Sequence, residues 1–229
     1  MSATTDPTTR PSPLLDGDHL SADEFMRRYE ATAEDFRAEL IEGVVHVMNS
    51  PVASDEHGEP QFDIDGILAL YKFATPGVKG SNNATLMLDA DNLYQPDCIL
   101  FLPLTKGGRF RRAGRYLQGA PELVVEVSAS TVRIDMNEKL RNYARVGVRE
   151  YIVWRTRDAE IDWFELKDER FESIPADADG VTHSRAFPGL WIDLTALVAG
   201  ANERSVEVVS AGIASAEHAE FVERLRAEK

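Results

Sequence analysis

Cysteine is nearly absent from this chain, since Cys98 is the only one among 229 residues. A lone cysteine cannot form an internal disulfide, so the sequence does not fit a disulfide-stabilised secreted domain. Its position in an apolar run is better explained by a small buried side chain than by a nucleophile. We therefore expect a protein of a reducing compartment, the cytoplasm.

Long apolar runs are also absent. No stretch approaches the roughly 20 residues that a membrane-spanning helix requires, and residues 1–13 lack the apolar segment of a secretion signal. We expect no membrane association and one domain with a sizeable core. The expected organisation is a disordered or extended tail over residues 1–19, a folded domain over residues 20–199, and a helical extension over residues 200–229.

Positive charge is scarce. The chain has 25 basic and 39 acidic residues, a net charge of −14. Electrostatic repulsion between an acidic protein and nucleic acid slows their association. Residues 104–149 reverse the balance with ten basic and four acidic side chains. This segment is either a solvent-exposed cationic loop or a phosphate-binding surface. The residues that would bind nucleic acid are Lys106, Arg109, Arg111, Arg112 and Arg115.

Hydrophobic periodicity predicts a mixture of helices and strands. Ser21 followed by Glu24 is typical of a capping box, and the spacing from Asp135 to Gly147 predicts the clearest helix. The other expected helices cover residues 21–30, 61–73, 194–198 and 216–229. Strands are expected at residues 38–43, 44–48, 84–88, 98–102, 123–127, 151–154, 160–166, 170–174 and 181–183, with loops at 49–59 and 106–119. This order predicts an α/β or α+β fold with a mixed central sheet flanked by helices.

Two acidic side chains accompany the apolar strands. Asp97 opens the run 98–102, and Glu126 lies inside Leu-Val-Val-Glu-Val, which is typical of a strand covered on both faces. A buried carboxylate needs a cationic partner or a metal ion. A salt bridge to an arginine would also satisfy Glu126, and Asp97 could be a turn residue at the strand start.

Helical geometry directs a lysine toward the same strands. At about 100° per residue, Lys139 lies about 60° from Met136 and about 40° from Tyr143 on the predicted helix. It therefore flanks the apolar stripe that faces the sheet, although it could instead extend along that stripe to solvent. Together with Asp97 and Glu126, it forms a set suited to phosphodiester hydrolysis with a divalent cation.

The expected chemistry is metal-assisted hydrolysis. Carboxylate oxygens of Asp97 and Glu126, with the backbone carbonyl of Val127, are the ligands that a hard cation such as Mg²⁺ prefers. The cation would activate a water, and Lys139 would orient that water or stabilise the developing charge. Three further side chains could support the site: Glu39, Glu42 and His57. The histidine is also explained as a polar group at the start of a helix.

These motifs resemble the Uma-type restriction endonuclease family, a bacterial branch of the PD-(D/E)xK nuclease superfamily. The similarity covers residues 20–197. It is carried by Glu39-Leu-Ile-Glu-Gly43 with Met48, by Gln95-Pro-Asp97, by residues 121–131, by Asp135 with Lys139 and Tyr143, and by residues 147–151 and 187–194. The resemblance implies a restriction-endonuclease-like core, Mg²⁺ or Mn²⁺ as cofactor, DNA as the substrate class, and a homodimer.

The resemblance also implies roles for individual residues. Asp97 and Glu126 match the two acids, and Glu39 matches a glutamate near the first strand. The superfamily lysine usually lies two residues after the second acid, where this chain has Ser128. The family's lysine matches Lys139 on the following helix, so all four residues would be catalytic.

Three functions remain open. The first is a metal-dependent nuclease that hydrolyses phosphodiester bonds, with DNA as the expected substrate. The second is an inactive nuclease-like domain that binds nucleic acid or a protein partner, which the net charge of −14 favours. A glycoside hydrolase with paired carboxylates is the weakest, because the 8% aromatic content shows no concentrated sugar-binding platform.

Overall fold

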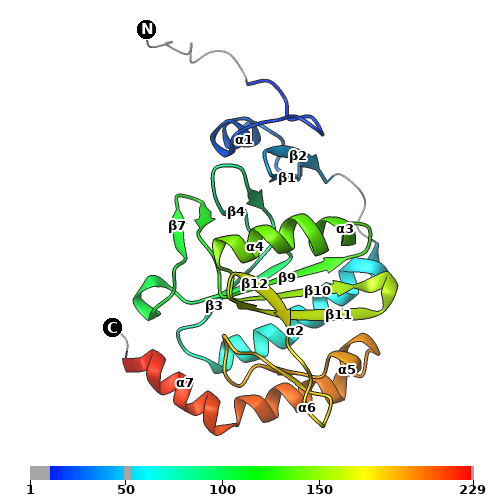
Figure 1. Cartoon of the computed structure of the whole chain (residues 1–229), viewed down its shortest axis with the longest axis vertical. Coiled ribbons are helices and arrows are strands. Elements are labelled where there is room, and N and C mark those ends of the chain that lie inside the picture. Colours follow the sequence, from blue (N-terminus) through cyan, green and yellow to red (C-terminus); the bar gives the residue numbers. More distant parts are fainter. Residues whose placement is uncertain (1–10, 49–52, 228–229) are drawn as a thin grey trace.

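A six-stranded sheet occupies the centre of the structure (Figure 1), a computed structural model that describes residues 11–48 and 53–227. Its strands in spatial order are β12 (Arg170–Ser173), β11 (Glu160–Lys167), β10 (Glu150–Arg155), β9 (Leu123–Ser128), β6 (Cys98–Phe101) and β3 (Lys79–Asn82). The sheet is mixed, because β9 and β10 are parallel while the other neighbours are antiparallel. The predicted mixed α/β class is thereby confirmed.

A helical crossover joins the two parallel strands, as parallel pairing requires. Its parts are α3 (Val132–Ile134), the wide π-helical turn η3 (Asp135–Lys139) and α4 (Leu140–Val146). Gly147 ends the crossover with a φ of 85°, a conformation that glycine adopts without steric cost. The crossover lies over one face of the central sheet (Figure 1).

Four helices cover the opposite face of this sheet (Figure 1). They are α2 (Glu59–Ala74), α5 (Leu194–Val198), α6 (Asn202–Ile213) and α7 (Ala216–Ala227). The apolar face of α2 consists of Ile64, Ile67, Leu68 and Tyr71, all buried and spaced as in an amphipathic helix.

Strand β9 is buried along its whole length, as its apolar sequence predicted. Val125 and Val127 pack into the core cluster with α2, whereas Val124 packs with Tyr143 on the α4 side. Because side chains alternate along a strand, Glu126 shares the face of Val124. This alternation places a carboxylate beneath the crossover.

A second mixed sheet contains the N-terminal strands. Its order is β2 (Val44–Val47), β1 (Ala38–Ile41), β5 (Leu93–Tyr94), β4 (Leu86–Met87), β8 (Tyr116–Gln118) and β7 (Arg111–Ala113). Helix α1 (Ala22–Tyr29) packs onto this sheet through Phe25. Ser21 caps α1 by accepting the Glu24 backbone N–H at 3.4 Å, but the Glu24 carboxylate binds Arg27 and Arg28, so only half of the predicted capping box forms.

Several local predictions were wrong. Residues 106–119, expected as a loop, contain the β7–β8 hairpin, whose polar sequence hides its strands. Residues 181–183 do not extend the central sheet, because β13 (Thr182–His183) pairs with β14 (Trp191–Ile192). The short helical turns η1 (Ser54–Gly58), η2 (Leu104–Lys106) and η4 (Thr156–Asp158) were also not predicted. Residues 49–52 of the predicted 49–59 loop lie outside the described residues.

Residues 11–19 contact the second sheet. The Gly17 backbone N–H donates to the Val45 carbonyl at 2.8 Å, and Leu14 is buried. Residues 1–10 of the predicted tail lie outside the described part of the chain. Among the helices that the structure describes, none combines the length and the apolar character needed to cross a bilayer.

His218 fastens α7 to the end of α2. Its Nε2 lies 2.9 Å from the Thr75 hydroxyl oxygen. The Thr75 hydroxyl also lies 2.7 Å from the Tyr71 carbonyl, to which it donates, so Thr75 links α2 to the imidazole. Burial lowers the pKa of His218 below its usual range, and the ring therefore favours the neutral form in the folded protein.

We predict that His218→Gln changes how stability depends on pH. A histidine with a lowered pKa binds fewer protons in the folded state than in the unfolded chain. The free energy of unfolding of the wild type should therefore fall as the pH drops below about 6.5, and the variant should lack this contribution. Urea titrations between about pH 5 and 8 measure how the free energy of unfolding depends on pH, with the exposed His19→Gln as control. Equal slopes in all three proteins would contradict the prediction.

Candidate active site

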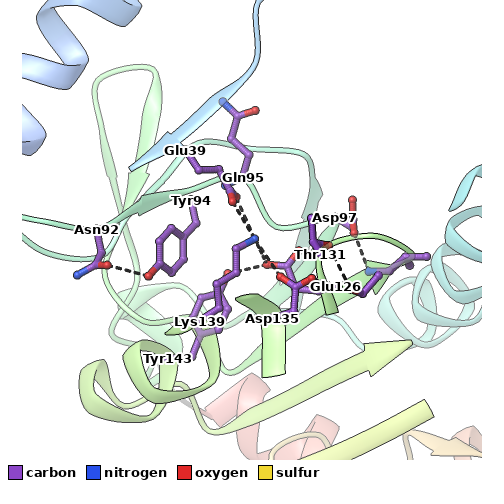
Figure 2. A network of polar contacts seen from close by, with 12 residues as sticks. Glu39, Asn92, Tyr94, Gln95, Asp97, Glu126, Thr131, Asp135, Lys139 and Tyr143 are labelled. Atoms are coloured by element: carbon purple, nitrogen blue, oxygen red, sulfur yellow. Dashed lines mark hydrogen bonds and ion pairs between the residues drawn. The ribbon is translucent and has the colours of Figure 1, made fainter. Parts of the chain in front are cut away.

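One ammonium group is enclosed by three carboxylates, a set that we call the Lys139 cluster (Figure 2). The Lys139 Nζ lies 2.9 Å from Glu39, 3.0 Å from Glu126 and 3.5 Å from Asp135. None of the four residues is more than 5% exposed. Because charge this deeply buried is costly when it is isolated, each member depends on the others.

Three chain segments build the Lys139 cluster. Glu39 comes from β1 in the second sheet, and Glu126 comes from β9 in the central sheet. Asp135 and Lys139 lie at the two ends of η3, four residues apart on one side of the crossover. The candidate site therefore lies where the two sheets meet beneath the crossover helix.

Hydrogen bonds from uncharged donors orient the carboxylates. These bonds run from the Tyr143 hydroxyl to Glu126 at 2.9 Å, from the Gln95 backbone N–H to Glu39 at 2.6 Å, and from the Ser128 hydroxyl to Asp135 at 2.7 Å. The Tyr94 ring adds a cation–π contact, with its centre 5.4 Å from the Lys139 Nζ. Each acid is thus held by a second partner besides the lysine.

Asp97 adjoins the Lys139 cluster through the backbone of β9. Its Oδ2 accepts the Val127 N–H at 2.7 Å, and its Oδ1 lies 3.3 Å from the His57 Nε2 at η1. The Gln61 side chain of α2 donates to the Asp97 carbonyl at 3.3 Å. The structure thus brings Asp97 to the residue that follows Glu126, and it brings His57 to Asp97.

Burial and neighbouring charges set the protonation of the Lys139 cluster. Burial raises the pKa of Glu126 well above its usual range; the charge of Lys139 opposes this shift, and the charges of Asp135 and Asp97 reinforce it. Burial alone would lower the pKa of Lys139, but the adjacent Glu126, Glu39 and Asp135 raise it well above its usual range. Lys139 is therefore an ammonium ion at neutral pH.

The pKa of His57 also depends on the neighbouring acidic side chains. Its hydrogen bond to Asp97 raises the pKa of the imidazole, against the effect of burial. Even with Glu126 protonated and His57 charged, three carboxylates face two cationic groups. The candidate site therefore has an excess of negative charge, which favours a further cation.

Some oxygen atoms of the candidate site are of the type that a hard divalent cation binds. Among residues 11–48 and 53–227, no group of three or more His, Cys, Asp or Glu side chains could hold a metal ion alone. Mg²⁺ rarely needs such a cage, because it commonly binds one or two carboxylates and keeps water or phosphate oxygens. Asp97, Glu126 and the Val127 carbonyl could supply those protein ligands. The buried Asp135 Oδ1 accepts no hydrogen bond, and its contact with the Lys139 Nζ at 3.5 Å is the longest ion pair of the cluster.

The remaining predicted residues lie outside the Lys139 cluster. Glu42, in the β1–β2 turn, contacts Arg141 at 3.4 Å and Asn142 at 3.3 Å. The five basic residues proposed for nucleic-acid binding lie on η2 and around the β7–β8 hairpin: Lys106, Arg109, Arg111, Arg112 and Arg115. Arg109 donates to the Gly147 carbonyl at the end of the crossover, so it stabilises that helix end.

Several members of the site received no role from the sequence. Asp135 precedes Lys139 by four residues and Tyr143 follows it by four, a spacing that places all three on one helix side and could have identified them. Ser128 was noted only as a departure from the superfamily motif. Gln95 contributes through its backbone N–H, for which the sequence offers no signal.

Comparison with known proteins identifies the family of the chain and a similar fold. The Uma2 family model, described as putative restriction endonuclease, matches residues 22–195. A crystal structure of a putative nuclease belonging to DUF820 from Anabaena variabilis ATCC 29413 has a TM-score of 0.54 and 14% identity, and the match covers 78% of this chain and 99% of that chain. No curated protein matches the chain. The family match spans well over half of the sequence, and the chain belongs to the Uma2 family of putative restriction endonucleases.

Proposed function

We propose that the protein is a metal-dependent nuclease that hydrolyses phosphodiester bonds in DNA. The supporting observation is the convergence of Lys139, Glu126 and Glu39 within hydrogen-bond distance, with Asp97 bonded to the next residue of β9. A purely structural ion pair requires one acid for one base. Here the acids outnumber the bases, and the surplus oxygen ligands suit a hard cation.

The side chains divide the expected chemistry between them. A divalent cation, when bound, would polarise the scissile phosphate and lower the pKa of a coordinated water. Lys139, kept charged by its neighbours, would offset negative charge that develops on the phosphate. Tyr143 fixes the orientation of Glu126, and the Val127 N–H fixes that of Asp97, so both acids are pre-oriented.

The second candidate is an inactive nuclease-like domain that binds nucleic acid or a protein. The observation that favours it is the near-complete burial of Lys139, at 5% exposure, with its charge already neutralised by carboxylates. The net charge of −14 also opposes approach to DNA. Measurements of metal binding and of cleavage separate the two candidates.

We predict that Asp97→Asn weakens Mn²⁺ binding at least roughly tenfold. The change keeps the shape of the side chain but removes the anionic oxygen expected to hold the cation. Isothermal titration calorimetry with Mn²⁺ and with Mg²⁺ measures the effect, and the exposed Asp179→Asn is the matched control. Metal binding of unchanged strength in Asp97→Asn would remove Asp97 from the site.

We predict that Lys139→Gln lowers cleavage by roughly 100-fold or more, because the group that offsets the developing charge is lost. Supercoiled plasmid, single-stranded DNA and RNA are the substrates, each with Mg²⁺ and with Mn²⁺. The surface variant Lys167→Gln should cleave like the wild type. Circular dichroism checks that the variants fold, and Tyr143→Phe provides a milder change that should still slow cleavage. A fully active Lys139→Gln would refute the mechanism.

Cleavage of both strands of a duplex would use two such sites, and the proposal therefore includes a homodimer. Helix α2 exposes Phe62 by 80% and Phe73 by 76%, and burial of such large apolar side chains in an interface would favour association. We predict that sedimentation velocity at micromolar protein concentration detects a dimer that Phe73→Glu weakens. A wild type that sediments only as a monomer would contradict this part of the proposal.

A further inference from the structure

A concave site lies on the other side of α4, where this helix meets β12. The cavity has a volume of about 550 Å³, within the range of ligand pockets. Its apolar lining comes from Leu140, Ala144 and Phe171. Three guanidinium groups and one carboxylate complete the lining: Arg141, Arg145, Arg170 and Glu169. We call this cavity the arginine pocket.

The arginine pocket carries an excess of positive charge in a strongly acidic protein. Arg141 and Arg145 come from successive turns of α4, and their side chains stay 59% and 55% exposed despite ion pairs with Glu42 and Asp89. The Arg170 guanidinium has no hydrogen bond or ion pair with any residue that the structure describes. Three guanidinium groups can therefore turn N–H groups toward an anion, and among the described residues that of Arg170 has no acceptor.

The shape and chemistry of the arginine pocket narrow the ligand class. Guanidinium groups bind phosphate through paired hydrogen bonds, and the Cβ atoms of residues one helical turn apart lie about 5–6 Å from each other. An apolar floor that includes the Phe171 ring suits the flat face of a base or the edge of a sugar. An anion without an apolar portion would leave this floor unused.

We propose that the arginine pocket binds one nucleotide unit of a nucleic-acid strand. Arg141, Arg145 and Arg170 hold its phosphate, and Leu140 and Phe171 contact its base or sugar. This inference rests on the proposed nuclease function. The arginine pocket and the candidate active site are joined through the crossover, because α4 begins directly after Lys139. The crossover would then present Lys139 of η3 toward the sheet, and Arg141 and Arg145 of α4 toward the nucleic-acid strand.

Binding of a short fluorescent single-stranded DNA tests this inference, with a chelator present so that no cleavage occurs. Arg170→Gln should raise the dissociation constant about tenfold and reduce the slope of log Kd against log salt by about one. Arg141→Gln should act in the same direction. The exposed Arg224→Gln on α7 is the matched control and should bind like the wild type. Wild-type affinity and salt slope in both pocket variants would overturn the assignment.

Competitors identify the source of the nucleotide. Unlabelled oligonucleotide should displace the probe far better than adenosine monophosphate, and polyglutamate should displace it poorly. Equal displacement by the mononucleotide would reassign the arginine pocket to a free nucleotide, and efficient displacement by polyglutamate would reassign it to an acidic protein partner. Either result overturns the proposal.

The failure of this inference can be distinguished from failure of the nuclease proposal. Cleavage that requires metal and Lys139, together with unaltered DNA binding in Arg170→Gln, rejects the arginine pocket alone. DNA binding that depends on Arg170, without cleavage under any metal condition, retains the pocket and rejects the nuclease. A wild type that does not bind the probe rejects the pocket regardless of cleavage.

Discussion

The enclosure of the Lys139 ammonium by carboxylates from two sheets is the interaction on which the structure depends. Glu39 belongs to β1 and Glu126 to β9, so one buried cation joins the second sheet to the central sheet. Removing Lys139 would leave its carboxylate partners uncompensated inside the protein, which is among the costliest single changes to a folded state. Architecture and candidate chemistry therefore rest on the same contacts.

Such a cluster is a weak source of stability, because desolvation of several ions can outweigh their attraction. A core of well-packed apolar residues could join two sheets at lower cost. The presence of four buried ionisable groups, with each carboxylate oriented by an uncharged donor, is better explained by function than by stability. Outside the cluster, an ion pair from Glu56 to Arg157 at 2.8 Å links η1, which carries His57, to η4.

The sequence predicted much of the fold where local signals were strong. The helix that ends at Gly147 and the apolar strand around Glu126 both follow from periodicity, and both are confirmed. The β7–β8 hairpin escaped prediction because its short strands are polar and no alternation marks a buried face. The two-residue strands β13 and β14 owe their pairing to tertiary context, which no local pattern encodes.

The candidate site was predictable to a similar degree. Lys139 was placed by helical geometry, and Glu126 by the cost of burying a charge in an apolar strand. Which partners each would choose could not be derived, because Glu39 reaches Lys139 only after the two sheets come together. The arginine pocket was also hidden, since Arg170 lies far along the chain from α4 and only the fold brings them together.

The uneven spacing of the Lys139 partners along the chain has a consequence for folding. Lys139 is separated from Glu126 by 13 residues but from Glu39 by 100. Closing the longer loop costs more chain entropy, and contacts of this kind slow folding. The strand and crossover helix can meet first, whereas the ammonium gains its partner from the N-terminal hairpin only when the remote segments dock. Assembly of the Lys139 cluster is thereby coupled to the docking of the N-terminal hairpin onto the rest of the fold.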